Sequence, residues 1–395
     1  MSVAAPETLR TPRLVLRRPR GYDAQPMFDA YTSDPAVTRF LTWTTHENVE
    51  SAHTFLRRCD AVWTDGSAYP WVITVDGRLI GAIEVRLDGH RAEIGYAIAR
   101  TAWGQGFTTE AARAVVEWTL TQPAVRRVWA YTDVENVASA RVLEKVGMSR
   151  EGKVRQWYVP TGFGVPRDCW MYGRVKGGAL AAARAARLSS AAAAPAPVTI
   201  ARTGAATLET PRLLLRRLSV DDAEAIFTGY AQDPAVSRYT SWAPHRQLED
   251  TRGFLRQNEE GWTRGTVFSW AITRRDDGRL IGTTDFRLEG HRAEIGYVLA
   301  RSAWGQGYAT EVARAVTAWG LAQPDLARVW AVCDVDNKAS ARVLEKAGMT
   351  REACLRAWAA MPAFGAPRDV WCYASVKGGM GVLGSGAPIS KGGMR

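Results

Sequence analysis

The chain carries one long segment twice, and this duplication constrains its fold more than any other feature. The string TPRLVLRRP from Thr11 returns as TPRLLLRRL from Thr210, and ASARVLEKVGM from Ala138 returns as ASARVLEKAGM from Ala339. GRLIG and GHRAEIGY also occur once in each copy. The spacing of roughly 200 residues is far longer than the 20–50 residues of a solenoid repeat. Each copy is therefore predicted to fold as a complete domain.

The repeat predicts two domains joined by a linker. The first domain is assigned to residues 1–177 and the second to residues 207–378, called half one and half two below. Between them, residues 178–206 are rich in Ala and Pro; their first part predicts a short helix and the rest a flexible, partly extended linker. The Gly-rich residues 379–395 are predicted to fray.

The order of predicted elements within half one indicates the fold class. Residues 13–19 predict a strand and residues 21–34 and 51–66 predict helices, and residues 70–100 then predict three strands joined by turns at VDG and LDGH. Helices over 108–122 and 135–147 alternate with strands over 126–133 and 167–175. This order predicts an α/β fold of the mixed α+β type, with a partly parallel, twisted central sheet flanked by helices.

Charge and cysteine content restrict the class of partner. The 51 basic and 40 acidic residues give a net charge of +11, which favours an anionic partner such as a phosphorylated cofactor. No dense run of Lys and Arg predicts a nucleic-acid tail, so no nucleic-acid partner is expected, although a ribosome or nucleic-acid binder stays open as an alternative. The five cysteines are odd in number and lack paired spacing, so neither a metal site nor a disulfide framework is predicted. No signal peptide or apolar span is found, and a cytoplasmic protein is expected.

A glycine loop, Gly104-Gln105-Gly106, lies between a predicted strand and a predicted helix, and it recurs in half two. Glycine permits a tight turn and close approach of a ligand, and the unpaired N–H groups of a helix start favour an anion such as pyrophosphate. The dinucleotide fingerprint is excluded because its third glycine is missing, and a Walker A loop because no lysine follows. A purely structural strand-to-helix turn remains the alternative.

The strings WGQGFTTEA and WGQGYATEV are each followed by N-x-x-S-A-R-V-L-E-K-x-G-M. Together with the opening TPRL-x-LRR, the GY strand and the late RD strand, they resemble the GCN5-related N-acetyltransferase (GNAT) superfamily. The nearest branch is that of the ribosomal-protein N-terminal acetyltransferases of the RimJ/RimL type. The resemblance covers both halves and implies two tandem GNAT domains that bind acetyl-CoA and release CoA.

The resemblance also implies which residues bind the cofactor. The loop backbone would hold the pyrophosphate and the strand before it would lie along pantetheine. Both loops begin with Trp where the family pattern has Gln or Arg, and half one has Thr108 where half two has the more usual Ala309. The implied cofactor-binding residues are Ile98, Arg100, Gly104, Gln105, Gly106, Phe107, Thr108, Thr109 and Asn136 in half one, and Leu299, Arg301, Gly305, Gln306, Gly307, Tyr308, Ala309, Thr310 and Asn337 in half two.

Acetyl transfer to an amine needs a proton acceptor and a donor for the leaving sulfur. Glu93 and Glu294, on the strand before each loop, are predicted to accept the amine proton through a water; outward carboxylates paired with Arg are the alternative. Ser139 and Ser340 are implied as donors to the sulfur. The preceding asparagines also suit a helix N-cap, which needs no function.

Other polar and aromatic residues of the repeated strings are expected to have structural roles. Tyr96 and Tyr297 are predicted to belong to the core, and His90 and His291 are predicted to be solvated in a turn. Asp168 and Asp369 are expected to shape the acceptor groove, and four tryptophans are expected to pack: Trp43, Trp157, Trp242 and Trp358.

The predicted function is N-acetylation of a primary amine. A peptide or protein N-terminus, or the amine of a peptide-like natural product in a self-resistance or tailoring role, is favoured. An α-amine is about 10% neutral at pH 7, but a lysine amine only about 0.04%. Two alternatives stay open: one half only binds CoA or serves as a scaffold, or the whole chain senses CoA or binds substrate without turnover. The expected assembly is a monomer with its halves packed as a pseudo-dimer, or a homodimer.

Overall fold

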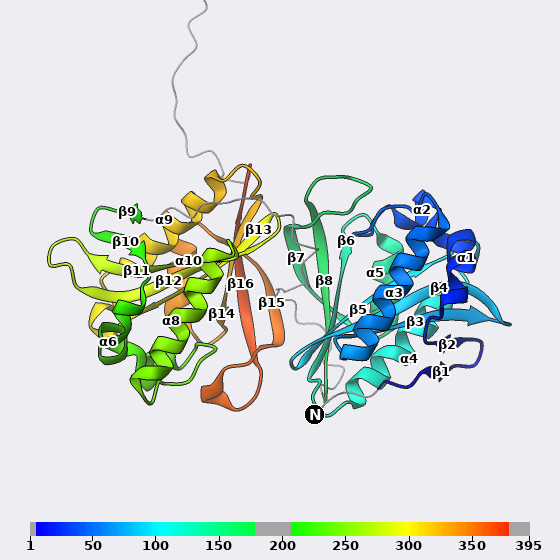
Figure 1. Cartoon of the computed structure of the whole chain (residues 1–395), viewed down its shortest axis with the longest axis horizontal. Coiled ribbons are helices and arrows are strands. Elements are labelled where there is room, and N and C mark those ends of the chain that lie inside the picture. The colour runs from blue at the N-terminus through cyan, green and yellow to red at the C-terminus, as the bar shows by residue number, and fades with distance from the viewer. Residues whose placement is uncertain (1–4, 178–206, 379–395) are drawn as a thin grey trace, which may run out of the picture.

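The computed structural model describes residues 5–177 and 207–378, and the predicted linker and tail lie outside these ranges. Sixteen strands form one continuous sheet. Their order is β1-β2-β3-β4-β5-β6-β8-β7 and then β15-β16-β14-β13-β12-β11-β10-β9, so the second half of the sheet repeats the first in reverse. Figure 1 shows the two halves side by side, with β7, β8, β15 and β16 at the centre.

Half one contains eight strands and five α-helices. The strands are β1 (Thr8–Arg10), β2 (Val15–Arg17), β3 (Ala68–Val75), β4 (Arg78–Asp88), β5 (Arg91–Ile98), β6 (Arg127–Asp133), β7 (Ser149–Tyr158) and β8 (Arg167–Val175). The helices are α1 (Ala24–Met27), α2 (Pro35–Thr38), α3 (Val49–Asp65), α4 (Phe107–Thr121) and α5 (Val137–Lys145). All strand pairs are antiparallel except the parallel pair β5 and β6, so the predicted mixed sheet is confirmed.

Half two repeats these elements in the same order. Its strands are β9 (Thr207–Glu209), β10 (Leu213–Arg217), β11 (Val267–Arg274), β12 (Leu280–Glu289), β13 (Arg292–Leu299), β14 (Arg328–Asp334), β15 (Thr350–Ala359) and β16 (Arg368–Val376). Its helices are α6 (Ala223–Ile226), α7 (Pro234–Ser237), α8 (Leu248–Thr263), α9 (Tyr308–Ala322) and α10 (Lys338–Lys346). The parallel pair is β13 and β14.

Helices cover both faces of the sheet in each half. In half one, α4 and α5 bury Ala111, Val115 and Leu143 against one face of β3 to β6. The short helix α1 and the long helix α3 bury Met27 and Leu56 on the other face. Each face thus has its own apolar cluster. The burial of these clusters supplies most of the free energy that drives folding.

One predicted helix is wrong in part, and the long strand β7 is missing from the prediction. The helix predicted over residues 21–34 consists of a 3₁₀ turn, the short α1 and a π turn over Phe28–Thr32. The strand β7 was not predicted. Charged residues are frequent in its sequence, and its charged and apolar residues do not alternate as they do in a strand with one face in water.

The strand β7 joins the two halves. It pairs antiparallel with β15, with Gly152 opposite Ala353. Beside this pair Arg127 lies fully buried on Glu151, and Arg328 lies fully buried on Glu352 at 2.6 Å. Each of these arginines also donates to a carbonyl oxygen of the opposite half, Arg127 to Arg356 at 2.8 Å and Arg328 to Arg155 at 2.7 Å. We call this contact region the seam.

Tryptophans fill the seam between the two halves. Trp129 packs edge-on against Trp358 with ring centroids 5.6 Å apart, and Trp157 packs in the same way against Trp330 at 5.8 Å. All four indoles belong to one buried cluster that includes residues of both halves. The expectation that Trp157 and Trp358 are packing residues is therefore confirmed, and the halves form a common core.

Candidate active site

The parallel strands of each half separate and leave a gap in the sheet. The strands β5 and β6 pair only from Arg91 to Glu93 on β5, with Glu93 opposite Trp129. Beyond this point β5 continues to Ile98 beside β4, while β6 continues to Asp133 beside β8. The equivalent strands β13 and β14 separate in the same way after Glu294. A ligand can insert between the separated strands and reach their unpaired backbone groups.

The glycine loop lies at the end of β5 and begins α4. Gly104 and Gly106 adopt left-handed backbone conformations with φ of 76° and 81°, and Gly106 is the N-cap of α4. The first helical hydrogen bond here is donated by Glu110 to Gly106 at 3.0 Å, so the N–H groups of residues 107–109 have no partner within the helix. Gly305 and Gly307 have φ of 76° and 82° before α9. Both loops thus present donors to an anion.

A carboxylate fixes the position of each loop. Glu110 of α4 accepts hydrogen bonds from the Thr11 hydroxyl at 2.6 Å and the Arg13 guanidinium at 2.7 Å. Arg13 also donates to the carbonyl oxygen of Gln105 at 3.0 Å. These hydrogen bonds hold the pKa of Glu110 below its usual range. In half two, Glu311 and Arg212 repeat the arrangement, with Arg212 donating to Gln306 at 2.9 Å.

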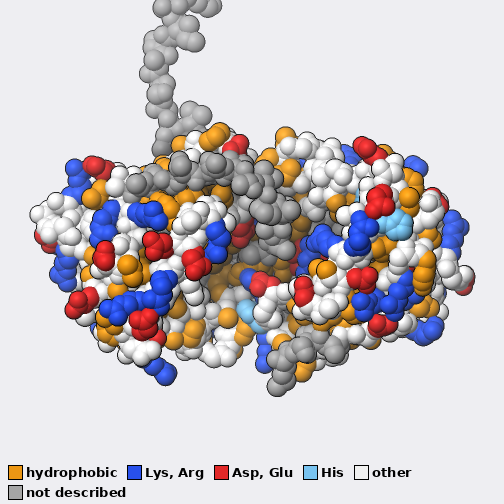
Figure 2. All heavy atoms as spheres, viewed as in Figure 1, with side chains coloured by type: hydrophobic (Ala, Val, Ile, Leu, Met, Phe, Trp, Pro, Cys, Tyr) orange, Lys and Arg blue, Asp and Glu red, His pale blue; other side chains and the backbone are white. Residues whose placement is uncertain are grey.

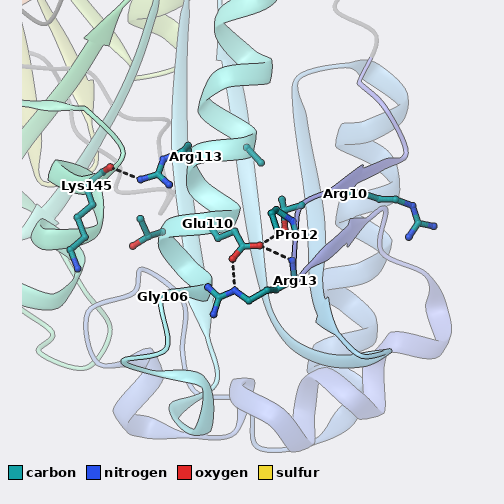
Figure 3. A pocket seen from close by; sticks show the side chains of 10 residues that line it. Arg10, Pro12, Arg13, Gly106, Glu110, Arg113 and Lys145 are labelled. Carbon is teal, nitrogen blue, oxygen red and sulfur yellow. Dashed lines mark hydrogen bonds and ion pairs between the residues drawn. The ribbon is translucent and has the colours of Figure 1, made fainter.

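A basic pocket of about 510 Å³ lies beside the loop of half one (Figure 3). Gly106 and Thr109 line it, together with the basic side chains of Arg10, Arg113 and Lys145. In Figure 3 Arg113 points toward the backbone of Lys145, to whose carbonyl oxygen it donates at 2.9 Å. The position of Arg10 is occupied by Glu209 in half two. The pocket suits a phosphorylated ligand that continues outward from the loop.

The remaining predicted cofactor residues surround the gap. The carbonyl oxygen of Ile98 accepts the Trp103 indole N–H at 2.9 Å, and Leu299 accepts that of Trp304 at the same distance. Arg100 is paired with Asp34 at 3.1 Å, so its guanidinium is already engaged with a carboxylate. The same holds for Arg301, which lies 2.6 Å from Asp233. Phe107 and Tyr308 lie under the guanidinium groups of the loop-fixing arginines.

Helix N-capping positions the residues at the start of α5 and α10. The side-chain oxygen of Asn136 accepts the N–H of Ser139 at 3.1 Å, and Asn337 does the same for Ser340. The N-cap role is therefore present in both halves, and it leaves the amide NH₂ of each asparagine for a ligand.

Tyrosines that the sequence assigned to the core contribute their hydroxyl groups to the site. The ring of Tyr96 packs against the core as predicted, but its hydroxyl lies 3.0 Å from the Ser139 hydroxyl, and Tyr297 lies 2.8 Å from that of Ser340. Burial raises the pKa of both tyrosines, so both are protonated at neutral pH. The hydroxyl pair spans from β5 to α5, a contact across 43 residues that no local sequence pattern contains.

The two predicted bases lie on the opposite face of the same strands. Tyr96 follows Glu93 by three positions, an odd number, and side chains alternate along a strand, so the carboxylate and the hydroxyl point to opposite faces. The side chain of Glu93 is 11% exposed and lies 3.9 Å from Arg86. In half two, burial raises the pKa of Glu294 to about 7, while the charge of Arg287 acts in the opposite direction.

Both carboxylates line one cavity at the seam. Its volume is about 320 Å³, and half one and half two contribute side chains to it. The lining residues are Arg86, Leu87, Asp88, Arg91, Glu93 and Trp129 from half one, and Glu289, Glu294, Trp330 and Trp358 from half two. The sequence places Glu93 and Glu294 in separate domains, and only the packing of the halves brings them to one chamber.

The prediction that His90 and His291 are solvated is wrong. His90 lies 3.2 Å from the carbonyl oxygen of Ala357, and His291 lies 3.1 Å from that of Gln156, each across the seam. Burial is the main cause that lowers the pKa of His291 to about 4, so this ring is neutral at pH 7. The histidines link the halves.

The aspartates expected to shape the acceptor groove fix the backbone at the seam. Asp168 accepts the backbone N–H of Gln156 at 3.0 Å, and Asp369 accepts that of Ala357 at 2.7 Å. Gln156 and Ala357 have positive φ values of 49° and 47°, which are uncommon for residues other than glycine. The carboxylates therefore stabilise the bends whose carbonyl oxygens meet the histidines.

The charged side chains, the cysteines and the helices show further properties of the described residues. On the face seen in Figure 2, basic and acidic side chains are interspersed over both halves. All five cysteines are free and buried. Within residues 5–177 and 207–378, no cluster of three or more His, Cys, Asp or Glu could hold a metal. No helix in these ranges is long and apolar enough to cross a membrane.

Comparison with known proteins gives one family for both halves. Residues 13–149 and 212–350 each match the acetyltransferase (GNAT) domain family. The uncharacterized N-acetyltransferase YoaA of Bacillus subtilis (strain 168) is 36% identical over 173 residues, which are 43% of this chain and 96% of YoaA.

Solved structures align with about half of the chain. The GNAT-family acetyltransferase of Bacillus anthracis is 29% identical, covering 43% of this chain and 98% of its own, with a TM-score of 0.39. RimL, a ribosomal L7/L12 α-N-protein acetyltransferase in complex with coenzyme A, is 25% identical over the same shares, with a TM-score of 0.40.

Proposed function

The chain belongs to the GNAT acetyltransferase family in both of its halves, and from this premise we propose that each half transfers acetyl from acetyl-CoA to an α-amine or similarly weak amine base. The chain is an N-acetyltransferase, and acetyl-CoA is its acyl donor. The acceptor we favour is the N-terminal amine of a peptide or protein, or the amine of a peptide-like natural product in a self-resistance or tailoring role.

The observation that carries this proposal is the gap between β5 and β6, with its two unlike faces. At one end of the gap, the loop N–H groups of residues 107–109 would bind the pyrophosphate of the cofactor, and the amide of Asn136 would hold the pantetheine arm. The basic pocket beside Gly106 would accommodate the outer phosphate. When bound, acetyl-CoA supplies an acyl group activated as a thioester.

The residues on the two faces have complementary proton-transfer roles. Glu93 accepts the proton of the incoming ammonium group, directly or through one water, and thereby makes the amine nucleophilic. On the opposite face, the Tyr96 and Ser139 hydroxyls would donate a hydrogen bond and then a proton to the sulfur as its bond to the carbonyl carbon breaks. The attacking nitrogen would release its second proton to water, and water would return a proton to the donor hydroxyl. The base and the donor thus lie on opposite sides of the reacting carbonyl carbon. Glu294, Tyr297 and Ser340 would act in the same way in half two.

A second candidate is that only half two catalyses transfer while half one binds CoA without turnover. Two observations favour it. Glu294 has a pKa raised to about 7 by burial, close to the working range of a general base. Half one also has Thr108 at the loop position where half two has Ala309.

Mass spectrometry of amines incubated with acetyl-CoA tests the proposal. Wild type, Glu93→Gln, Glu294→Gln and the double variant are compared, with Glu224→Gln on an exposed position of α6 as a control. A general base contributes about 10²–10⁴ in rate, so the double variant should lose at least about a hundredfold. Loss in one single variant identifies the working half. A double variant that acetylates at the wild-type rate removes the carboxylates from the mechanism.

A further inference from the structure

Two loops meet over the end of the gap in half one. The loop of residues 39–48 follows α2, whose N-cap aspartate pairs with Arg100 just beyond the end of β5. The loop of residues 159–166 leads into β8, and Arg167 at the start of β8 lies 2.7 Å from Asp133 at the end of β6. In Figure 1, α2 and the loop between β7 and β8 both lie at the upper edge of half one. The two loops are thus anchored to the two strands that separate.

Hydrogen bonds join these two loops in half one. The backbone N–H of Thr161 donates to the carbonyl oxygen of Leu41 at 3.0 Å, and the Thr161 hydroxyl donates to that of Trp43 at 2.8 Å. Gly162 lies so close to the other loop that a Cβ atom there would be 2.7 Å from the carbonyl oxygen of Arg39. Only glycine therefore fits at this position without a shift of the backbone. We call this set of contacts the tie.

Half two has the same two loops but different residues at the tie. Pro362 occupies the position of Thr161, and it has neither a backbone N–H nor a hydroxyl group to donate. Ala363 occupies the position of Gly162 and carries the Cβ atom that the close contact in half one excludes. The tie of half one therefore cannot form in the same way in half two.

The aromatic contact between the loops is common to both halves. Phe40 and Phe163 have ring centroids 5.7 Å apart, and Tyr239 and Phe364 have the same separation. Within the described part of the chain, no hydrogen bond joins the loop of Tyr239 to the loop of Phe364. Ring contacts rather than hydrogen bonds thus hold the loops of half two, so these loops can separate at a lower cost in free energy.

The tie lies on the face of the sheet from which an acceptor would approach Glu93. Side chains alternate along β5, so Ala97 points to the same face as Glu93. Ala97 packs against Met27 and Leu56 of α1 and α3, and Val37 of α2 belongs to the same cluster. The helices α4 and α5 cover the other face. A chain that extends from the reacting amine toward the ends of β5 and β6 would therefore have to pass between the two loops.

We propose that the tie determines which acceptors each half admits. Half one takes small amines only, whereas half two also takes an amine that continues into a polypeptide chain, as at the N-terminus of a peptide or protein. Thr161 and Gly162 in half one, and Pro362 and Ala363 in half two, are then specificity-determining residues. The inference rests on the proposed function for the identity of the reacting amine, but the ligand that each half admits is measured without turnover.

Hydrogen exchange in the full chain, resolved to the Thr161 amide, tests the tie itself. Gly162→Ala forces the loops apart, so this amide should exchange at least about tenfold faster than in wild type, as expected for the loss of one hydrogen bond. Val165→Ala is the matched control, because it introduces the residue of half two at an exposed position of the same loop. An unprotected Thr161 amide in wild type, or equal exchange in Gly162→Ala, overturns the proposal.

Two CoA conjugates test which acceptors each half admits. In both, the CoA sulfur is joined through a methylene and a carbonyl group to the amine of a probe, which is alaninamide in one conjugate and a decapeptide with N-terminal alanine in the other. Calorimetric titration of the full chain should find two alaninamide conjugates but only one decapeptide conjugate per chain. Any other pair of counts overturns the proposal.

A double variant converts the tie of half one to the residues of half two. Thr161→Pro with Gly162→Ala should raise the count of decapeptide conjugates from one to two per chain and leave two alaninamide conjugates bound. A decapeptide count that stays at one would mean that the tie is not the barrier, which contradicts the proposal. Val165→Ala should leave both counts unchanged.

The two proposals fail in different ways. If the conjugates bind in the expected numbers but neither alaninamide nor the decapeptide is acetylated, the role of the tie stands and the proposed function is wrong. If both amines are acetylated but two decapeptide conjugates bind to the wild-type chain, the function stands and the tie does not select acceptors.

Discussion

The two halves have the same fold but surround their carboxylates differently. In half one, Arg86 lies 2.5 Å from Glu84 and 3.9 Å from Glu93. In half two, the residue equivalent to Glu84 is the shorter Asp285, which lies 2.6 Å from Arg287. The duplicated framework therefore places the predicted bases alike, and in each half the arginine beside the base pairs with a neighbouring carboxylate, which is one methylene group shorter in half two.

A second difference lies where each half meets the seam. The Tyr158 hydroxyl donates to Asp133 at the end of β6, at 3.0 Å, next to the turn that leads to Asn136. In half two the position of Tyr158 is occupied by Ala359, which has no hydroxyl. Asp334, equivalent to Asp133, keeps its ion pair with Arg368 at 2.8 Å. The hydrogen bond from Tyr158 on β7 to Asp133 on β6 is thus present only in half one. The buried ion pairs of the seam are common to both halves.

The largest predicted effect tests whether the two buried ion pairs of the seam contribute equally to stability. Arg127→Met and Arg328→Met each leave a buried glutamate, Glu151 or Glu352, with one fewer cation. Breaking a buried ion pair costs about 3–5 kcal/mol, and both variants should lose stability by this amount in denaturant unfolding. Arg57→Met, which breaks an exposed pair with Glu50, should cost less than about 1 kcal/mol.

The outcomes of these variants separate two kinds of seam. Equal losses mean that the halves stabilise one another reciprocally. A loss confined to one variant would show that one half folds on its own and supports the other, and the symmetric account of the seam would then be wrong.

The next prediction concerns pH and the unequal carboxylates. The pKa of Glu294 is raised from 4.5 to about 7 in the folded protein, mainly by burial. Between these values the folded state binds one proton more than the unfolded state, so stability falls as pH rises from about 4.5 to 7. Glu294→Gln removes this loss and should stabilise the protein by about 3 kcal/mol more at pH 8 than at pH 4.5. Denaturant unfolding at the two pH values measures the difference.

Glu93→Gln is the matched variant in half one. It removes a carboxylate that lies 3.9 Å from Arg86, and it shows whether the pH dependence belongs to half two alone. A pH dependence as large as that of Glu294→Gln would mean that the effect is not specific to half two.

The sequence predicted the parts of this fold and site that depend on local pattern. Helix periodicity gave α4 with Val115 in the core, and glycine spacing gave the loop at Gly106. Strand β7 was missed because Glu151 is buried and the half-buried Arg155 is paired, each with a partner from another element. Periodicity assumes that charged residues face water, and at the seam they do not.

Long-range hydrogen bonds account for the error at His90 and for the unpredicted contact of the Tyr96 hydroxyl. His90 meets a carbonyl group 267 residues away, and the hydroxyl of Tyr96 meets Ser139 across the gap between strands. Neither partner is adjacent in sequence, so a solvated histidine and a core tyrosine were the reasonable expectations from local context. The same limitation applies to the chamber at the seam. Its two carboxylates, Glu93 and Glu294, lie 201 positions apart in the sequence.

The smallest predicted effect sharpens the comparison at the loops. Thr108 lies in the first turn of α4, where its hydroxyl can donate to the pyrophosphate beside the loop N–H groups, and Ala309 offers no such donor. One hydrogen bond to a charged group contributes about 1.5 kcal/mol, which is roughly a tenfold change in affinity. Thr108→Ala should weaken CoA binding to half one by about this factor, and Ala309→Thr should strengthen binding to half two. Calorimetric titration with CoA resolves the two sites if their affinities differ. Tighter binding in Thr108→Ala would mean instead that the methyl group of Thr108 crowds the phosphate, and half one would then be the half with the poorer cofactor site.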